Sequence, residues 1–232
     1  MAEPIVFLPD VLCDARLFGP QLAELSSDYG VMTMPLGEGE RISDLAEKVL
    51  ALGPKRMALV GTGLGGLVAM EIMRRAPASL SRLALIATSP LQESPFASID
   101  YEPMLIAART GRLAEIVPTL TGVSAEDGEL LALLQDMAQA VGVERFVAQV
   151  RALQRRRDMQ AVLRKCACPA VVICGADDTL TPPKRHQIMA EFIPDAEFCV
   201  IEGAAHVPTL QAPAQVTAAL RQWMAQPLVL RS

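Results

Sequence analysis

Residues 57–73 read MALVGTGLGGLVAMEIM, and this stretch decides the fold. The apolar run Met57–Val60 has the length and composition of a buried strand, and apolar residues at helical spacing follow the glycines. The glycines of Gly61–Gly66 allow a sharp turn between the two. A strand, a glycine turn and a helix form the layout of a nucleophile elbow, G-x-S-x-G, whose serine attacks the substrate. In this chain Gly63 stands at the position of that serine.

The composition favours one globular domain that acts on small molecules. The chain has 232 residues, of which 51% are hydrophobic, which is enough for a sizeable core. Its net charge of −5 disfavours nucleic acid and anionic membranes as partners. No apolar stretch approaches the roughly 20 residues of a membrane span, and the N-terminus lacks the basic region of a signal peptide. We therefore expect a cytoplasmic protein, either a monomer or a small homo-oligomer.

The cysteines indicate neither a metal site nor a disulfide framework. Cys166 and Cys168 are one residue apart, which is not the C-x-x-C spacing of zinc or redox motifs. The five cysteines are an odd number without regular spacing, as expected of reduced thiols in the cytosol, with Cys174 and Cys199 buried in strands. We predict no metal and no cofactor.

Short β-type runs alternate with helical patterns over residues 1–90 and again over residues 169–232. Successive βα units predict an α/β fold with a mainly parallel, doubly wound sheet and helices on both of its faces. The expected strands are 5–8, 31–34, 57–60, 83–87, 170–174 and 198–201, and the expected helices are 20–25, 42–50, 64–75, 183–192 and 213–224.

The alternation breaks between residues 91 and 168, where only helical periodicity is found. We predict that residues 91–168 form a helical lid or cap, inserted into a single α/β core that the two flanking stretches build. Met104, Leu105 and Phe146 are apolar positions of this segment that could line a pocket, although simple packing is the more common role at this spacing.

Polar residues gather at the predicted carboxyl ends of the strands, where open α/β sheets bind their ligands. Asp10 follows the first strand, Asp177 and Asp178 follow the strand 170–174, and His206 lies a few residues past the last strand. Imidazole titrates near neutrality, so His206 is a candidate general base. A carboxylate behind it would fix its tautomer and stabilise the imidazolium.

The chain contains only two histidines. His186 lies among Lys184, Arg185 and Gln187, which the pattern assigns to the polar face of a helix. We therefore expect His186 at the surface, which leaves His206 for the site.

The order of elbow, acid and histidine along the chain resembles that of α/β-hydrolase-fold proteins. The resemblance is to small esterase and lactonase-like members, and it covers nearly the whole chain through residues 7–17, 60–66, 173–178 and 203–206. It implies a Ser-His-Asp type of site with His206 and with Asp178 as the acid, and an oxyanion hole made by the backbone amides of Val11 and Leu64. Because the sequence starts directly at the first parallel strand, we expect the family's N-terminal antiparallel hairpin to be absent.

Two positions depart from this family pattern. Asp10 stands where such proteins normally have a glycine, and an anionic side chain beside an oxyanion hole opposes developing negative charge unless it points away. Gly63 replaces the nucleophile, and loss of a triad serine costs on the order of a million-fold in turnover, roughly 8 kcal/mol of barrier. Glycine adopts the strained elbow conformation at little steric cost. We expect the fold to be kept and acyl-enzyme hydrolysis to be nearly absent.

Three functions are open on these residues. The first is a hydrolase scaffold for small carboxylic esters, thioesters or lactones with its nucleophile position vacant at Gly63, for which Gly63→Ser would restore hydrolysis of short p-nitrophenyl esters. The second is a serine-independent enzyme in which His206 and Asp178 act directly on water or on a carbon acid. The third is a non-catalytic protein that binds a small apolar ligand, with ligand-induced stabilisation that survives mutation of both residues.

Overall fold

A computed structural model describes residues 3–92 and 95–228 and contains a six-stranded sheet whose neighbouring strands are all parallel. The strand order is β2-β1-β3-β4-β5-β6. This confirms the predicted parallel α/β fold, and every expected strand is present. The strands are β1 (Ile5–Leu8), β2 (Val31–Thr33), β3 (Met57–Thr62), β4 (Leu80–Ile86), β5 (Ala170–Gly175) and β6 (Glu197–Ile201).

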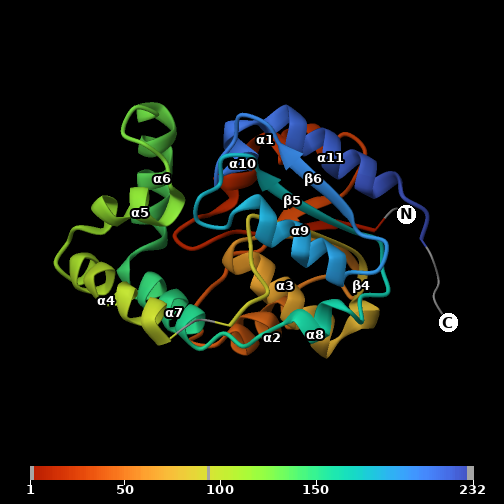
Figure 1. The fold of residues 1–232 in the computed structure, drawn as a ribbon, viewed down its shortest axis with the longest axis horizontal. Coiled ribbons are helices and arrows are strands. Elements are labelled where there is room, and N and C mark those ends of the chain that lie inside the picture. The colour runs from red at the N-terminus through yellow and green to blue at the C-terminus, as the bar shows by residue number, and fades with distance from the viewer. Residues whose placement is uncertain (1–2, 93–94, 229–232) are drawn as a thin grey trace.

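Helices cover both faces of the sheet, as the alternation of strands and helices predicts (Figure 1). On one face α3 contacts α2 and α8, and α8 contacts α9. On the other face α11 contacts α1 and α10 (Figure 1). The helices on the two faces are α2 (Ile42–Leu52), α3 (Leu64–Arg75), α8 (Gln160–Leu163) and α9 (Pro183–Phe192), and then α1 (Gly19–Leu25), α10 (Pro208–Gln211) and α11 (Pro213–Ala225).

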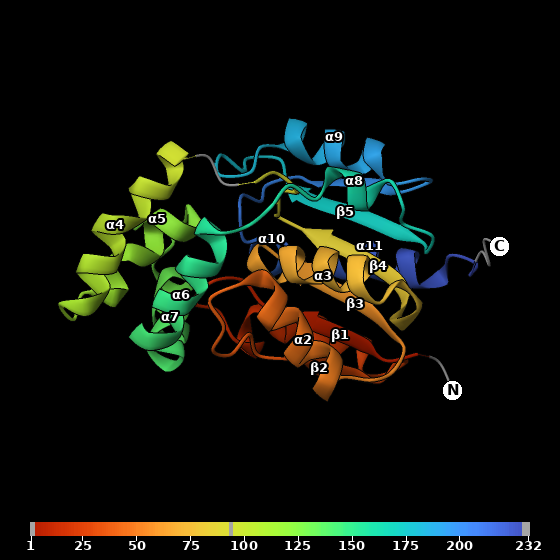
Figure 2. The same ribbon diagram turned by 90° about the horizontal axis from the view of Figure 1, so that it is seen from below.

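The described residues between β4 and β5 form helices and loops and no strand. Residues 93 and 94 of this segment are not among the described residues. Four of its helices lie together beyond one end of the sheet, and α8 returns to contact α3 and α9 (Figures 1 and 2). The four are α4 (Pro95–Arg109), α5 (Val117–Thr121), α6 (Gly128–Val141) and α7 (Val143–Gln154). None of the helices in the described residues is long and apolar enough to cross a membrane.

Strand β4 begins three residues earlier than the expected start at residue 83. Ser81 and Arg82 interrupt the apolar pattern, yet both are buried in the structure. The Arg82 guanidinium donates hydrogen bonds to the carbonyl oxygens of Trp223, at 3.2 Å, and Gln226 at the end of α11. A charged side chain can be buried when its donors are satisfied. The polar residues Ser81 and Arg82 therefore belong to the buried strand, although the apolar pattern predicts its start only after them.

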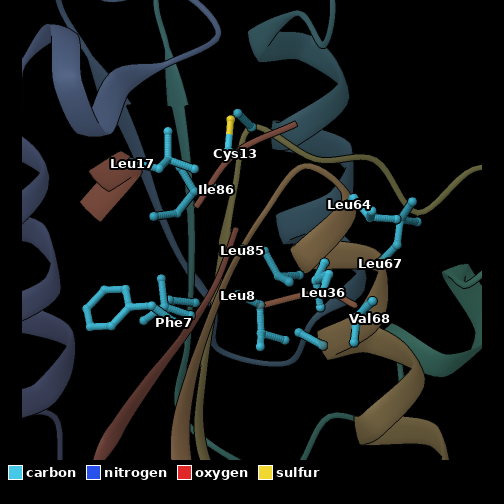
Figure 3. Packing of buried hydrophobic residues seen from close by; sticks show 14 of the residues in the cluster. Phe7, Leu8, Cys13, Leu17, Leu36, Leu64, Leu67, Val68, Leu85 and Ile86 are labelled. Atoms are coloured by element: carbon cyan, nitrogen blue, oxygen red, sulfur yellow. The ribbon is translucent and has the colours of Figure 1, made fainter. Parts of the chain in front are cut away.

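Side chains of β1 alternate between the two sides of the sheet, as expected for a strand that is buried on both faces. Figure 3 shows Phe7 on the side of Leu17, and Leu8 on the side of Val68 in α3. The Phe7 ring packs against Phe18 with centroids 4.9 Å apart. The core therefore holds β1 rigidly between its neighbours and fixes the loop that follows it.

Candidate active site

The sharp turn between β3 and α3 has the strained backbone of a nucleophile elbow. Gly63 has φ 51° and ψ −112°, a conformation that L-residues rarely adopt. Its N–H donates to the carbonyl oxygen of Ile86 at 3.0 Å, and its own carbonyl accepts the Thr88 hydroxyl at 2.7 Å. The elbow is therefore formed and held from the neighbouring strand although it carries no serine.

Asp10 lies in the loop that follows β1, and its carboxylate points into the site. Oδ1 accepts hydrogen bonds from the backbone N–H groups of Val11 and Leu64, both at 2.7 Å. These are the two amides that the resemblance assigns to the oxyanion hole, and both point at the same oxygen atom. The anion that they hold is the carboxylate of this chain itself, so Asp10 does not point away.

Gly63 and Asp10 are sterically complementary. A Cβ atom added to Gly63 would lie 2.0 Å from both Cγ and Oδ2 of Asp10, far inside van der Waals contact. The carboxylate thus fills the space that a serine side chain would need. The two departures from the family pattern form one arrangement, in which glycine at 63 leaves room for aspartate at 10.

Asp178 is the acidic residue that the structure brings to His206. The Nδ1–H group of His206 donates to Oδ2 of Asp178 at 2.9 Å, and the Thr181 hydroxyl donates to the same oxygen at 2.8 Å. The backbone N–H groups of Leu180 and Thr181 donate to Oδ1, each at 2.9 Å. Burial raises the pKa of Asp178, but these hydrogen bonds and the imidazole outweigh it and lower that pKa. Asp177 is exposed and takes no part.

His206 lies between two carboxylates at the carboxyl end of the sheet. Its Nε2 atom is 3.7 Å from Oδ2 of Asp10, on the side opposite to Asp178. Burial by itself lowers the pKa of His206, but the facing Asp10 carboxylate and the hydrogen-bonded Asp178 carboxylate raise it to about 9. At neutral pH the imidazole is therefore protonated and donates a proton, and it becomes a base only after losing that proton.

His186 is buried, so the prediction that it faces solvent is wrong. The N–H group of Thr88 donates to its Nε2 atom at 3.1 Å, and Thr88 in turn bonds to the carbonyl of Gly63. Met189 and Ala190, three and four residues on, are also buried, and this helical spacing is the signal that the polar neighbours concealed. Burial lowers the pKa of His186 and keeps it neutral, as an acceptor from Thr88 must be.

A cavity of about 370 Å³ opens above the elbow. Asp10 and His206 form part of its wall, while Met104 of α4 and Leu120 of α5 line it from the helical segment. Leu105 and Phe146 are buried and do not line this cavity. The described residues hold no cluster of three or more His, Cys, Asp or Glu side chains that could bind a metal ion.

Comparison with known sequences identifies the family. Residues 7–220 match the sequence model of the alpha/beta hydrolase family. The chain belongs to this family. It is 27% identical over 199 residues to the pimeloyl-[acyl-carrier protein] methyl ester esterase of Yersinia pseudotuberculosis, an alignment that covers 81% of this chain and 74% of that protein. It is 22% identical to the putative carbamate hydrolase of Yersinia enterocolitica, over 96% of this chain and 87% of the other.

Solved structures show the same fold for this alpha/beta hydrolase. The enol-lactonase from Burkholderia xenovorans LB400 superposes with a TM-score of 0.86 at 21% identity, covering 97% of this chain and 92% of that one. A thermophilic esterase from Thermogutta terrifontis superposes with a TM-score of 0.85 at 22% identity, covering 96% and 89%. The chain therefore shares the fold of these proteins, and the family match over residues 7–220 confirms the predicted membership of the superfamily.

We expect the free energy of unfolding of this alpha/beta hydrolase to fall as pH rises from 6.5 to 9, by roughly 3 kcal/mol in total. Folding raises the pKa of His206 from 6.5 to about 9, so the resulting stabilisation is complete below pH 6.5 and is lost as pH rises through 9. Urea unfolding at a series of pH values measures the loss. His206→Gln should flatten the curve in this range, and equal slopes for parent and variant would contradict the raised pKa.

Proposed function

We propose that this alpha/beta hydrolase is a serine-independent enzyme for small molecules, in which Asp10, His206 and Asp178 do the chemistry. The observation that carries the proposal is the position of the Asp10 carboxylate, which occupies both amides of the oxyanion hole and the space of the missing serine side chain. A substrate carbonyl has neither a nucleophilic serine nor a free oxyanion hole in this site. Acyl-enzyme hydrolysis of esters, thioesters or lactones is therefore disfavoured.

The charges around the cavity favour an enzyme over a binding protein. An imidazole held between two carboxylates gives the cavity a charged wall, which a pocket for a small apolar ligand does not need. Strongly shifted pKa values in a cavity are typical of groups that transfer protons during catalysis. We further propose that the inserted segment, residues 91–168, acts as a lid, since side chains of α4 and α5 line the cavity.

A second candidate is the ester-hydrolase scaffold with a vacant nucleophile position. It is favoured by the geometry around the vacancy, because the amides of Val11 and Leu64 converge on one point and Asp178 orients His206. In that case the site retains the parts for acyl transfer but not the attacking atom. The chain as it stands would then turn over no ester, and a serine at position 63 together with removal of the Asp10 side chain would restore the activity.

Labelling with a fluorophosphonate probe tests the serine-independent proposal. Fluorophosphonates react with activated hydroxyl nucleophiles, so we expect the parent chain to remain unlabelled and to hydrolyse p-nitrophenyl butyrate at the background rate. The Asp10→Gly/Gly63→Ser double variant serves as the positive control for labelling. Stoichiometric labelling of the parent chain, at Thr62 or Ser89 for example, would show a displaced hydroxyl nucleophile and contradict the proposal.

Thermal stabilisation by a ligand separates the enzyme from a binding protein. Small apolar compounds are screened against the parent and against a His206→Gln/Asp178→Asn double variant. If the protein is an enzyme, we expect the parent to convert some of the stabilising compounds and the double variant to convert none of them. A compound that stabilises both proteins equally, and that neither converts, would instead favour a carrier or sensor.

A further inference from the structure

Gln149 joins the helical segment between β4 and β5 to the loop that carries Asp10. It lies on α7, and its side chain is buried. Its Oε1 atom accepts a hydrogen bond from the backbone N–H of Leu12 at 3.1 Å, and its Nε2 atom donates one to the carbonyl oxygen of Leu36 at 3.4 Å. Leu12 follows β1 and Leu36 follows β2, so a single side-chain amide contacts two loops of the core.

The backbone at Leu12 is strained and needs support from outside. Residues Asp10–Cys13 form a turn that is closed by a hydrogen bond from the N–H of Cys13 to the carbonyl oxygen of Asp10 at 3.1 Å. Leu12 is the third residue of this turn and has φ 57°. A positive φ at that position is typical of a type II turn, where glycine is the usual residue. A leucine keeps such a conformation only where its surroundings hold it, and Gln149 accepts its N–H.

The same turn carries the groups that set the charge of the site. Asp10 is its first residue, and Val11, its second, donates its N–H to Oδ1 of Asp10 at 2.7 Å. The other carboxylate oxygen, Oδ2, lies 3.7 Å from Nε2 of His206. A change in the backbone of the turn therefore moves the carboxylate relative to the imidazole.

Other contacts between the helical segment and the core do not fix the direction of the Leu12 N–H. Leu120 of α5 and Leu134 of α6 line a small gap beside Leu12, but apolar contacts are not directional. Arg151 of α7 pairs with Glu40 on the exposed side of the helix. This ion pair holds α7 on the core without touching the turn.

We propose that Gln149 is a positioning residue, which holds the Asp10–Cys13 turn so that the Asp10 carboxylate faces His206. The proposal rests on the serine-independent function argued above, since that function takes Asp10 and His206 as reacting groups. Movement of α7 away from the core breaks the bond to Leu12, releases the turn and withdraws the carboxylate. The position of the helical segment is thus coupled to the charge beside the imidazole.

NMR titration of the imidazole resonances measures this coupling without any substrate, because His206 and His186 are the only histidines of the chain. Burial lowers the pKa of both, but in His206 the carboxylates of Asp10 and Asp178 raise it to about 9. The two resonances are therefore distinguishable by their titration. The other charged side chains that line the cavity stay the same in every variant, namely Asp100, Arg156 and Arg185.

Gln149→Met keeps the length of the side chain and removes both of its hydrogen bonds. We expect the midpoint of the His206 titration to fall by about one pH unit, because the Asp10 carboxylate moves away while Asp178 remains. The behaviour of His186 should not change. Arg151→Met is the matched control, since it introduces the same residue on the same helix and removes the ion pair with Glu40 but not the bond to Leu12. It should leave the midpoint of His206 where it is in the parent chain.

A double-mutant cycle shows whether Gln149 acts through Asp10. Asp10→Asn removes the charge itself and should lower the midpoint of His206 at least as far as Gln149→Met does. In the Asp10→Asn background, Gln149→Met should then have no further effect. Folding of all variants is checked by circular dichroism. Gln149→Asn, whose side chain is one methylene too short to reach Leu12, takes the place of Gln149→Met if that variant does not fold.

Three outcomes overturn the proposal. An unchanged midpoint of His206 in a folded Gln149 variant would show that the turn keeps its shape without this hydrogen bond. An equal fall in Arg151→Met would assign the effect to general loosening of α7. A further fall in the Asp10→Asn background would mean that Gln149 acts by another route. None of these results depends on turnover, so fluorophosphonate labelling decides the proposed function separately.

Discussion

The Asp10→Gly/Gly63→Ser double variant is expected to hydrolyse short p-nitrophenyl esters at least ~10³-fold faster than the parent chain. Removing the carboxylate frees the amides of Val11 and Leu64 for the substrate's carbonyl oxygen. It also clears the space for the new serine, beside His206. The variant removes only the Asp10 charge, and Asp178 remains to orient the imidazole of His206. Steady-state rates with p-nitrophenyl butyrate measure the gain.

The single variants are the controls for this experiment. Gly63→Ser alone should gain little, because its Cβ would lie 2.0 Å from the Asp10 carboxylate. This revises the expectation that Gly63→Ser by itself restores hydrolysis. Asp10→Gly alone frees the oxyanion hole but supplies no nucleophile, so it should also stay near background. Equal gains for Gly63→Ser and the double variant would show that Asp10 moves aside freely, and no gain for a folded double variant would argue against the ester-hydrolase scaffold.

Gly65→Ala is expected to cost about 3 kcal/mol or more of unfolding free energy, or to prevent folding. The added Cβ would lie 2.1 Å from the backbone carbonyl oxygen of Leu8 in β1. Strand β1 pairs with β2 on one side and with β3 on the other. Neither element can shift without disturbing the sheet. Urea unfolding measures the effect, and expression in inclusion bodies would be the qualitative equivalent.

Gly128→Ala is the matched control, because it also changes a glycine to alanine within a helix. A Cβ at Gly128 would meet no atom within 4 Å. Alanine is the better helix former, so we expect no loss and up to about 0.5 kcal/mol of gain. If both variants were equally stable, the close approach of α3 to β1 would not be required by the fold.

The sheet could be predicted because its signals are local. Each strand is a short apolar run followed by a helical pattern, and parallel order follows from that alternation. The site's position followed as well, since the carboxyl ends of parallel strands meet at one edge. The structure brings Asp178 and His206 together at that edge, with Nδ1 of His206 2.9 Å from Oδ2 of Asp178.

The direction of Asp10 could not be read from the sequence. Its carboxylate is fixed by N–H groups of two segments far apart in the chain, and its fit beside Gly63 depends on the elbow's three-dimensional shape. His186 escaped prediction for a related reason, because three polar neighbours hid a histidine whose partner, Thr88, lies in another loop. In both cases a polar side chain is satisfied by backbone donors that no sequence pattern displays.

The fit between Asp10 and Gly63 also restricts how such a site can arise by stepwise substitution. A lineage that begins with glycine at 10 and serine at 63 has two possible orders of change. Introducing aspartate first creates the steric overlap, whereas replacing serine first gives a folded chain with glycine at both positions and no reacting side chain. The sterically open route therefore passes through an inert ancestor, in which the original activity is gone before the new carboxylate arrives.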